Sequence, residues 1–244
     1  STSRFPSKEK IVLDQSHKAM SVNLDACINC NLCVRACREV QVNDVIGMAY
    51  RGSTAKVIFD LDDRMGESTC VACGECVQAC PTGALMESSL VNEKGARVNY
   101  ADRTVDSLCP FCGVGCQTKV HVKDDKILHV DGKDGPANEN RLCVKGRFGF
   151  DYINHEGRLT KPLIRKASVP KDANFQLKDS NISDYFEETS WENALDIAAK
   201  GLAKSKDDHG PKSLAGFGSA KCSNEEAYLF QKLVRVGFGS NNVD

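Results

Sequence analysis

The stretch CINCNLCVRAC at residues 27–37 places four cysteines in the spacing C-x2-C-x2-C-x3-C. The stretch CVACGECVQAC at residues 70–80 repeats that spacing, so the chain contains an internal duplication. Cysteines packed this closely favour a metal centre over a disulfide framework. The chain has 244 residues and 13 cysteines, and all but Cys222 fall into three groups of four. This partition is the main indication of what the chain binds.

The repeated spacing is typical of bacterial ferredoxins, in which three thiolates of one run hold a cubane and the fourth cysteine binds the other cluster. We expect that fourth cysteine to lie at the start of a helix. The spacing therefore predicts two [4Fe–4S] clusters, one on Cys27, Cys30, Cys33 and Cys80, the other on Cys70, Cys73, Cys76 and Cys37. Structural zinc is the alternative, but zinc sites use paired ligands and gain nothing from a third cysteine at this spacing. Arg38 stands where a proline would follow the first run, and it leaves the ligand set intact.

A third group has a different spacing, C-x2-C-x3-C-x26-C, and comprises Cys109, Cys112, Cys116 and Cys143. Apolar and polar residues alternate in 118–122 and 126–130 on either side of Asp124-Asp125, which predicts a β-hairpin that returns Cys143 to the others. By itself this spacing also suits a zinc knuckle. Beside two ferredoxin runs, we expect a third [4Fe–4S] cluster and a chain that conducts electrons.

Composition excludes several other functions. Lys and Arg number 32 against 33 Asp and Glu, and the net charge of -1 gives no electrostatic basis for binding nucleic acid or an anionic membrane. The sequence has no apolar run long enough for a membrane span, and its first residues lack the apolar core of a signal peptide. We therefore expect a cytoplasmic protein with protein partners. The histidines show no metalloprotease or triad spacing and are interpreted as surface or satisfied packing residues: His17, His121, His129, His155 and His209.

The third group also carries a resemblance to a known family. CPFCGVGC at 109–116 and RLCVKGR at 141–147 resemble the cluster-binding start of molybdenum or tungsten bis-pterin oxidoreductases, and formate dehydrogenase most of all. The doubled ferredoxin run, with GESTC at 66–70, resembles the α subunit of soluble NAD-linked formate dehydrogenases. The resemblance covers nearly the whole chain.

The resemblance implies both a substrate and a set of partners. Formate would lose two electrons and a proton at a molybdenum or tungsten bis-molybdopterin guanine dinucleotide of the full-length subunit. Lys145 would relay electrons between that cofactor and the third cluster. The acceptors would be flavin- and NAD-binding diaphorase-type subunits that carry further iron–sulfur clusters.

The C-terminal residues predict two helices. Thr189 and Glu192 have the form of a capping box before a helix that ends near Lys206, and Ser223 with Glu226 opens a second helix through about Val236. Residues 213–217 read as a strand, so a Gly-rich turn joins strand to helix. Such a turn can direct backbone N–H groups at a phosphate, although most units of this kind only pack a sheet. The resemblance implies cofactor contacts for Gly218, Ser219, Lys221, Asn224 and Asn241, while Cys222 is interpreted as a free buried thiol.

Residues 239–244 resemble the family segment just before the cysteine or selenocysteine that binds the metal. We therefore expect no catalytic residue within this chain and no formate oxidation by the chain alone. Two rival functions stay open. One is the large iron–sulfur subunit of a respiratory NADH–quinone oxidoreductase, and the other is a non-catalytic, polyferredoxin-like electron carrier.

The predicted fold class is α+β. Residues 1–18 form a tail, and 19–100 form a two-cluster ferredoxin-like domain with a hairpin inserted around a strand at 56–60. Residues 101–165 form a small β-rich cluster domain. Residues 166–244 begin an α/β molybdopterin oxidoreductase domain, with a polar, irregular loop to about residue 188.

Overall fold

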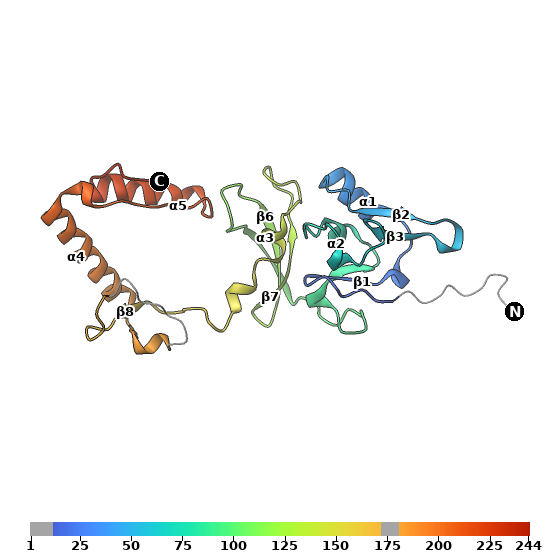
Figure 1. Ribbon diagram of the computed structural model, residues 1–244, viewed down its shortest axis with the longest axis horizontal. Helices are drawn as coiled ribbons and strands as arrows, with labels where there is room; N and C mark the ends of the chain where they lie inside the picture. Colours follow the sequence, from blue (N-terminus) through green and yellow to red (C-terminus); the bar gives the residue numbers. More distant parts are fainter. Residues whose placement is uncertain (1–11, 172–180) are drawn as a thin grey trace. The chain divides into compact units, whose positions relative to one another are not determined.

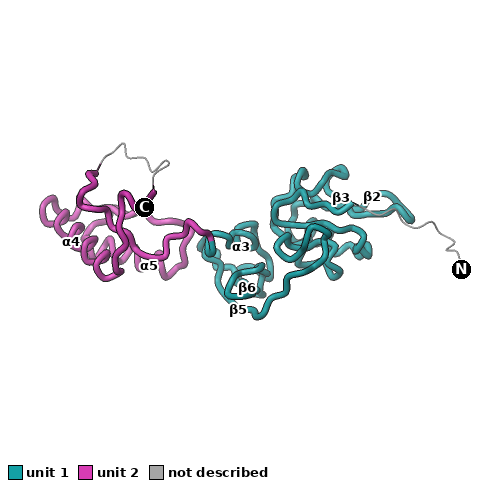
Figure 2. The backbone as a smooth tube through the Cα atoms, turned by 90° about the horizontal axis from the view of Figure 1, so that it is seen from below, with its two compact units in different colours: residues 1–154 teal, residues 155–244 magenta. Residues whose placement is uncertain are grey.

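The computed structural model describes residues 12–171 and 181–244, and the chain divides into two compact units, residues 1–154 and 155–244 (Figures 1 and 2). Both units combine helices with antiparallel strand pairs. None of the helices in the described ranges is long and apolar enough for a membrane crossing.

Two strand pairs hold the duplicated cysteine runs. β1 (Met20–Val22) pairs with β4 (Leu85–Glu87), so the two ends of the duplicated segment lie side by side (Figure 1). Between the runs, β2 (Ile46–Ala49) and β3 (Lys56–Phe59) form an antiparallel hairpin. This confirms the inserted hairpin that the strand pattern predicts.

Part of the predicted tail contacts this domain. Asp14 exchanges two backbone hydrogen bonds of 2.9 Å with Val22, and its carboxylate accepts the Met65 N–H at 2.8 Å. Several bonds to one carboxylate favour its charged form. Accordingly, although partial burial raises the pKa of Asp14, the hydrogen bonds from Met65 and Ser16 outweigh it and lower that pKa. Residues 1–11 of the predicted tail lie outside the described residues.

Each cysteine run leads into a helix through a residue with a left-handed backbone. α1 (Leu32–Arg35) follows Asn31 at φ 69°, and α2 (Glu75–Ala79) follows Gly74 at φ 72°. A π-helical turn, Ala36–Val40, continues α1. The helix thus begins before the third cysteine of each run and the fourth lies one turn later, so the prediction of a helix start at the fourth cysteine was wrong.

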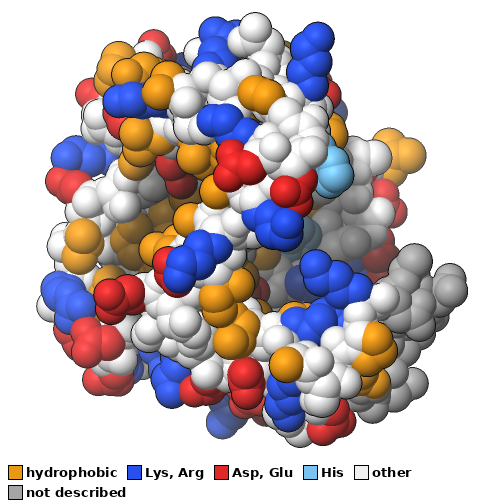
Figure 3. Space-filling model, turned by 90° about the vertical axis from the view of Figure 1, so that its left-hand side faces the viewer, with side chains coloured by type: hydrophobic (Ala, Val, Ile, Leu, Met, Phe, Trp, Pro, Cys, Tyr) orange, Lys and Arg blue, Asp and Glu red, His pale blue; other side chains and the backbone are white. Residues whose placement is uncertain are grey.

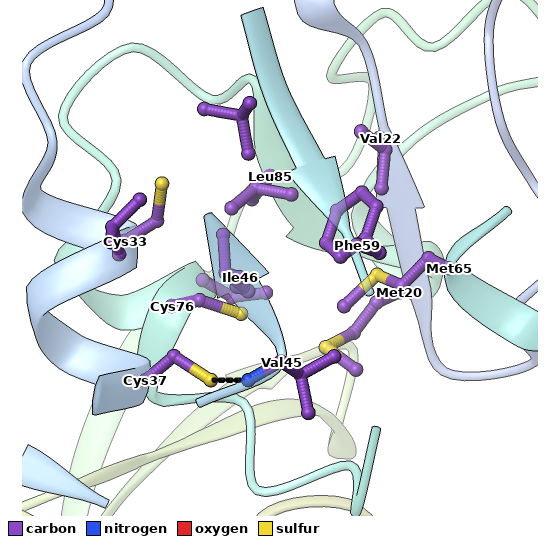
Figure 4. Packing of buried hydrophobic residues seen from close by; sticks show 13 residues of the cluster. Met20, Val22, Cys33, Cys37, Val45, Ile46, Phe59, Met65, Cys76 and Leu85 are labelled. Atoms are coloured by element: carbon purple, nitrogen blue, oxygen red, sulfur yellow. Dashed lines mark hydrogen bonds between the residues drawn. The ribbon is translucent and has the colours of Figure 1, made fainter. Parts of the chain in front are cut away.

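The hydrophobic core around the two cysteine runs contains cysteines as well as apolar side chains (Figure 4). Met20, Val22 and Phe59 are at most 4% exposed, and each such burial contributes roughly 1.5–3 kcal/mol. The Val45 N–H donates to Sγ of Cys37 at 3.4 Å (Figure 4). The buried cluster comprises Met20, Val22, Cys33, Val34, Cys37, Val45, Ile46, Val57, Phe59, Met65, Cys76, Val77 and Leu85.

The rest of the first unit is a three-stranded antiparallel sheet in the order β5 (Arg103–Leu108), β6 (Gln117–Lys123), β7 (Lys126–Gly132). The β6–β7 pair confirms the predicted hairpin. Its turn residues, Asp124 and Asp125, both have positive φ, as tight hairpin turns require. α3 (Val144–Phe148) contacts β7.

The second unit contains β8 (Leu163–Arg165) paired with β9 (Phe186–Glu188), followed by α4 (Trp191–His209) and α5 (Asn224–Lys232). A π-helical turn, Leu233–Phe238, continues α5. β9 lies inside the loop predicted to be irregular, and residues 172–180 of that loop lie outside the described residues. Short 3₁₀ turns in the two units are Leu24–Ala26, Gly52–Thr54, Met65–Glu67, Ser88–Leu90, Asp151–Asn154, Ile182–Asp184 and Pro211–Ser213.

Two predictions for the second unit need correction. The N-cap of α4 is Ser190, whose hydroxyl accepts the Asn193 N–H at 3.1 Å, so the predicted Thr189 box is one residue out of place. The Ser223–Glu226 box is confirmed. The predicted strand at 213–217 is reduced to a bridge between Gly216 and Val243, because Ser213 belongs to a 3₁₀ turn and backbone pairing with residues 242–244 begins only at Gly216.

The helices of this unit leave apolar side chains exposed. Trp191 and Leu195 of α4 and Leu229 of α5 are each at least 60% exposed. Figure 3 likewise shows hydrophobic side chains at the surface among charged ones. Within the described residues, these apolar side chains of the two helices therefore stay largely exposed.

Candidate metal centres

The first candidate centre joins the first cysteine run to the end of the second. Cys27, Cys30, Cys33 and Cys80 line one internal cavity together with Val57 and Leu85, which are 3% and 2% exposed. Burial, together with the charges of the other three thiols, raises the pKa of the Cys33 thiol to about 11. Thiolates crowded in an apolar shell need cations to balance them. The donor set therefore fits a [4Fe–4S] cubane.

The second candidate centre places Cys37 beside the second run. Burial raises the pKa values of Cys70 and Cys73, and it raises that of Cys76 far above the ordinary value. Cys37 lies close enough to contribute to all three shifts. Because Cys33 and Cys37 are one helical turn apart, one short helix supplies a thiol to each set.

The two loops direct backbone donors at sulfur in the same way. Asn29 and Ala72 occupy equivalent positions with φ of 55° and 56°. Their N–H groups donate to the preceding cysteine of each run, to Sγ of Cys27 at 3.4 Å and of Cys70 at 3.3 Å. A positive φ is uncommon for a residue such as Ala, so it shows how tightly the loop is turned. N–H groups directed at sulfur stabilise thiolates and tune the potential of a cluster.

Cys80 has the strongest set of donors. Burial by itself would raise its pKa, but hydrogen bonds from the backbone N–H groups of Leu85, Thr82 and Ala84 outweigh burial and lower it. Gly83, with φ of 72°, supplies the turn that brings these groups round the thiol. Cys80 is thus prepared for the thiolate form in which it would bind iron.

The third candidate centre lies at the open end of the three-stranded sheet. The Cys109 N–H donates to the Cys116 carbonyl at 2.9 Å and closes the loop that contains Cys112. Burial raises the pKa values of Cys109 and Cys116, and Cys112 and Cys143 add to both shifts. The four thiols therefore converge, and they fit a cluster by the same donor chemistry as the other two sets.

Buried Asn138 holds the loop that returns Cys143. Its Oδ1 accepts the Gln117 N–H at 2.9 Å, and its Nδ2 donates to the carbonyls of Gln117, Lys133 and Arg141 at 3.0–3.2 Å. These bonds tie the loop to the start of β6, next to Cys116. Sequence reasoning assigned the return to the hairpin alone, because a single Asn in a polar loop gives no distinguishing signal.

Arg147 connects the second and third centres. It is fully buried, and its Nε donates to the Cys73 carbonyl at 2.7 Å. Its two terminal nitrogens reach Gln78 at 2.9 Å, Glu75 at 3.3 Å and Asp131 at 3.4 Å. One guanidinium thus fixes α3, which follows Cys143, against the loop that carries Cys73.

Gly74 makes room for this contact. A Cβ at position 74 would lie 2.0 Å from Cδ of Arg147, and the backbone there has φ of 72°. The close approach requires glycine, and the left-handed conformation favours it. The equivalent residue of the first run, Asn31, also has a positive φ, so the contact with Arg147 distinguishes the second loop.

The remaining predicted site residues lie outside the three cysteine sets. Lys145 is exposed on α3, two residues after Cys143. Of the residues assigned to the pterin cofactor, Gly218 and Ser219 line a surface pocket, together with Cys222 and the carboxylates of Glu226 and Asp244. Lys221, Asn224 and Asn241 are not part of that lining, and the assignment of all five residues to the cofactor stays a prediction. Cys222 is half-buried, and its thiol donates to the Ser219 carbonyl at 2.8 Å.

Three families match successive parts of the chain. Residues 26–84 match the 4Fe-4S dicluster domain, residues 102–155 the molybdopterin oxidoreductase Fe4S4 domain, and residues 158–244 the molybdopterin oxidoreductase family.

Curated relatives agree with these matches. A Bacillus subtilis (strain 168) protein named as a probable oxidoreductase is 36% identical over 267 residues, covering 95% of this chain and 26% of the relative. A Staphylococcus aureus (strain USA300) protein provisionally named a formate dehydrogenase is 35% identical over 254 residues, covering 89% of this chain and 24% of the relative. The chain thus spans about a quarter of the length of these relatives.

A solved structure, the H2-reduced NAD⁺-reducing [NiFe]-hydrogenase, matches 40% of this chain and 43% of that chain at 26% identity. Its TM-score of 0.32 is too low to support an argument about the fold.

Replacing Arg147 tests the connection between the centres. Arg147→Met would leave the carboxylates of Glu75 and Asp131 without their buried partner, a loss worth about 3–5 kcal/mol in the free energy of unfolding. Amide hydrogen exchange in the core strands β1 and β4 should therefore accelerate by about a hundredfold or more. Arg141→Met is the matched control, because Arg141 is 48% exposed and pairs with Glu139 at the surface. Equal exchange rates in the two variants would contradict the role given to Arg147.

Proposed function

Because the chain is an iron–sulfur portion of a molybdopterin oxidoreductase, we propose that it conducts electrons from formate oxidation through three [4Fe–4S] clusters to a flavin- and NAD-binding partner. The observation that carries this proposal is the convergence of twelve cysteines into three sets of four. Two of these sets exchange their fourth thiol between runs that are far apart in the sequence. Such an arrangement suits closely spaced clusters better than independent zinc sites.

When bound, each cluster would accept and release one electron at a time. The residues of this chain supply the surroundings that such transfer requires. Val57, Leu85 and the rest of the buried cluster shield the inner thiols of the first two centres, Cys33, Cys37 and Cys76, from water. The N–H groups of Asn29, Ala72 and Val45 stabilise negative charge on sulfur. Arg147 donates to the Cys73 carbonyl and holds that loop in place.

Formate as the substrate is supported by the relatives and by the motif around the third set. The S. aureus relative bears a formate dehydrogenase name, and its similarity extends over 89% of this chain. The chain spans about a quarter of such proteins. The proposed reaction therefore belongs to the full-length subunit, with its molybdenum or tungsten bis-molybdopterin guanine dinucleotide. Lys145, exposed beside Cys143, is proposed to face that cofactor.

Iron content distinguishes the grouped cysteines from the remaining one. The fully loaded chain should hold roughly twelve irons and twelve acid-labile sulfides. Cys143→Ala should lose about four irons together with the EPR signal of one reduced cluster. Cys222→Ala is the control and should keep all twelve, because this thiol bonds only the Ser219 carbonyl within the described structure. Stoichiometric zinc without sulfide would contradict the cluster assignment.

Substrate use is tested on the full-length subunit, purified anaerobically with its cofactor. It should oxidise formate with a viologen acceptor, and it should reduce NAD only after the flavin-binding partner is added. The formate-dependent reaction should disappear when molybdate and tungstate are withheld during expression, while the iron content stays the same. NADH oxidation without any formate turnover would instead favour the NADH–quinone oxidoreductase alternative.

Lys145 is tested in the same full-length subunit. Lys145→Ala should slow the reduction of the clusters by formate, measured by rapid-freeze EPR, and should leave iron content and dithionite-reduced spectra unchanged. Lys126→Ala, at the tip of the β6–β7 hairpin, is the matched loss of an exposed positive charge. If both variants reduce their clusters at the wild-type rate, Lys145 has no part in the relay.

A further inference from the structure

Three potential metal ligands meet on one face of the β6–β7 hairpin, away from the cysteine sets. His121 of β6 lies opposite His129 of β7, with their rings stacked 3.9 Å apart and inclined by 14°. Asp131 lies two residues beyond His129, on the same face of the strand. Its Oδ2 is 2.9 Å from Nε2 of His121 and 3.8 Å from Nε2 of His129. One donor atom from each side chain lies within 4.8 Å of the others.

The two imidazoles have nitrogens without hydrogen-bond partners. The His129 side chain is 8% exposed, and its buried Nδ1 has no partner in the part of the chain that the structure describes. Nε2 of His121 is also buried, and its short approach to Asp131 is not aligned as a hydrogen bond. Buried polar nitrogens are nearly always satisfied, so these two indicate a missing ligand. The expectation that every histidine is a surface or satisfied packing residue was wrong for this pair.

The surroundings suit a cation. The buried carboxyl of Glu87 lines the same cleft as His129 and Asp131. The positive groups that face them are Arg147, already paired with Glu75, and Arg97. Imidazole nitrogens of this kind are the commonest metal ligands in proteins.

We propose that His121, His129 and Asp131 form a binding site for a divalent transition-metal cation of the zinc class. Two imidazoles and one carboxylate are a common ligand set for zinc, and hard cations such as calcium prefer oxygen alone. Arg147 holds the other oxygen of Asp131 at 3.4 Å, as residues around a metal site hold its carboxylate. His129, Asp131 and Glu87 also line a surface cleft, so water can reach the fourth position.

The cation would cross-link β6 and β7 beside Arg147. It is distinct from the proposed clusters in ligand type, because all three of its ligands are nitrogen or oxygen. The site does not depend on the function proposed for the chain, since its geometry contains no cysteine.

The test uses the anaerobically purified chain with its irons fully loaded, so that cysteine thiols are not free to take up zinc. One equivalent of Zn²⁺ should remain after gel filtration, and X-ray absorption should show a shell of nitrogen and oxygen at about 2.0–2.2 Å. Loss of a group that only hydrogen-bonds a metal ligand weakens metal binding by roughly 10–100-fold. His121→Gln removes a ligand itself, at a partly exposed side chain, and should weaken zinc binding by more than that. Its iron content and EPR spectra should stay unchanged.

His155→Gln is the matched control, because that histidine lies in the second unit and its Nδ1 accepts the Gly157 N–H. It should bind zinc like the wild type. A sulfur shell near 2.3 Å, absence of retained zinc, or equal zinc affinity in His121→Gln and His155→Gln would each overturn the proposal.

Discussion

The first unit depends on one constraint. Thiols from two distant cysteine runs must meet in two sets, each of which combines three thiols of one run with one thiol of the other. The β1–β4 pair and the buried cluster bring the runs together, and the left-handed residues at the start of each helix turn the loops inward. Burial then makes the innermost thiolates costly without cations, as the raised pKa values of Cys33 and Cys76 indicate. The fold therefore makes iron binding and the packing of this core parts of the same process.

Much of this arrangement could be predicted from spacing. The cysteine groups, the inserted hairpin and the β6–β7 hairpin follow from local patterns that repeat every two or three residues. The contacts of Arg147 and Asn138 could not be predicted, because each joins segments that no local pattern relates. The His121–Asp131 cluster was missed for a similar reason, since its members become neighbours only through the cross-strand register. In the second unit, the strand predicted at 213–217 is shortened, because Ser213 belongs to a 3₁₀ turn and backbone pairing with residues 242–244 begins only at Gly216.

Arg147 shows how one buried charge can organise two sites. Its bonds to the Cys73 carbonyl, Gln78, Glu75 and Asp131 use the planar fork of the guanidinium, which lysine could not reproduce. Gly74 is the counterpart of this contact, because a larger residue would occupy the space of the arginine. The same arginine also restrains Asp131. Arg147 therefore anchors both the helix that follows the third cysteine set and the histidine cluster.

The helix formed by α1 and its π-helical turn has a consequence for the order of assembly. It carries Cys33 for one set and Cys37 for the other, so inserting the first cubane would orient the helix and present the remaining thiol to the second. Maturation of the two centres would then be cooperative. Conversely, oxidative damage to either centre would loosen the shared helix and expose its neighbour to oxygen, so that both are lost together.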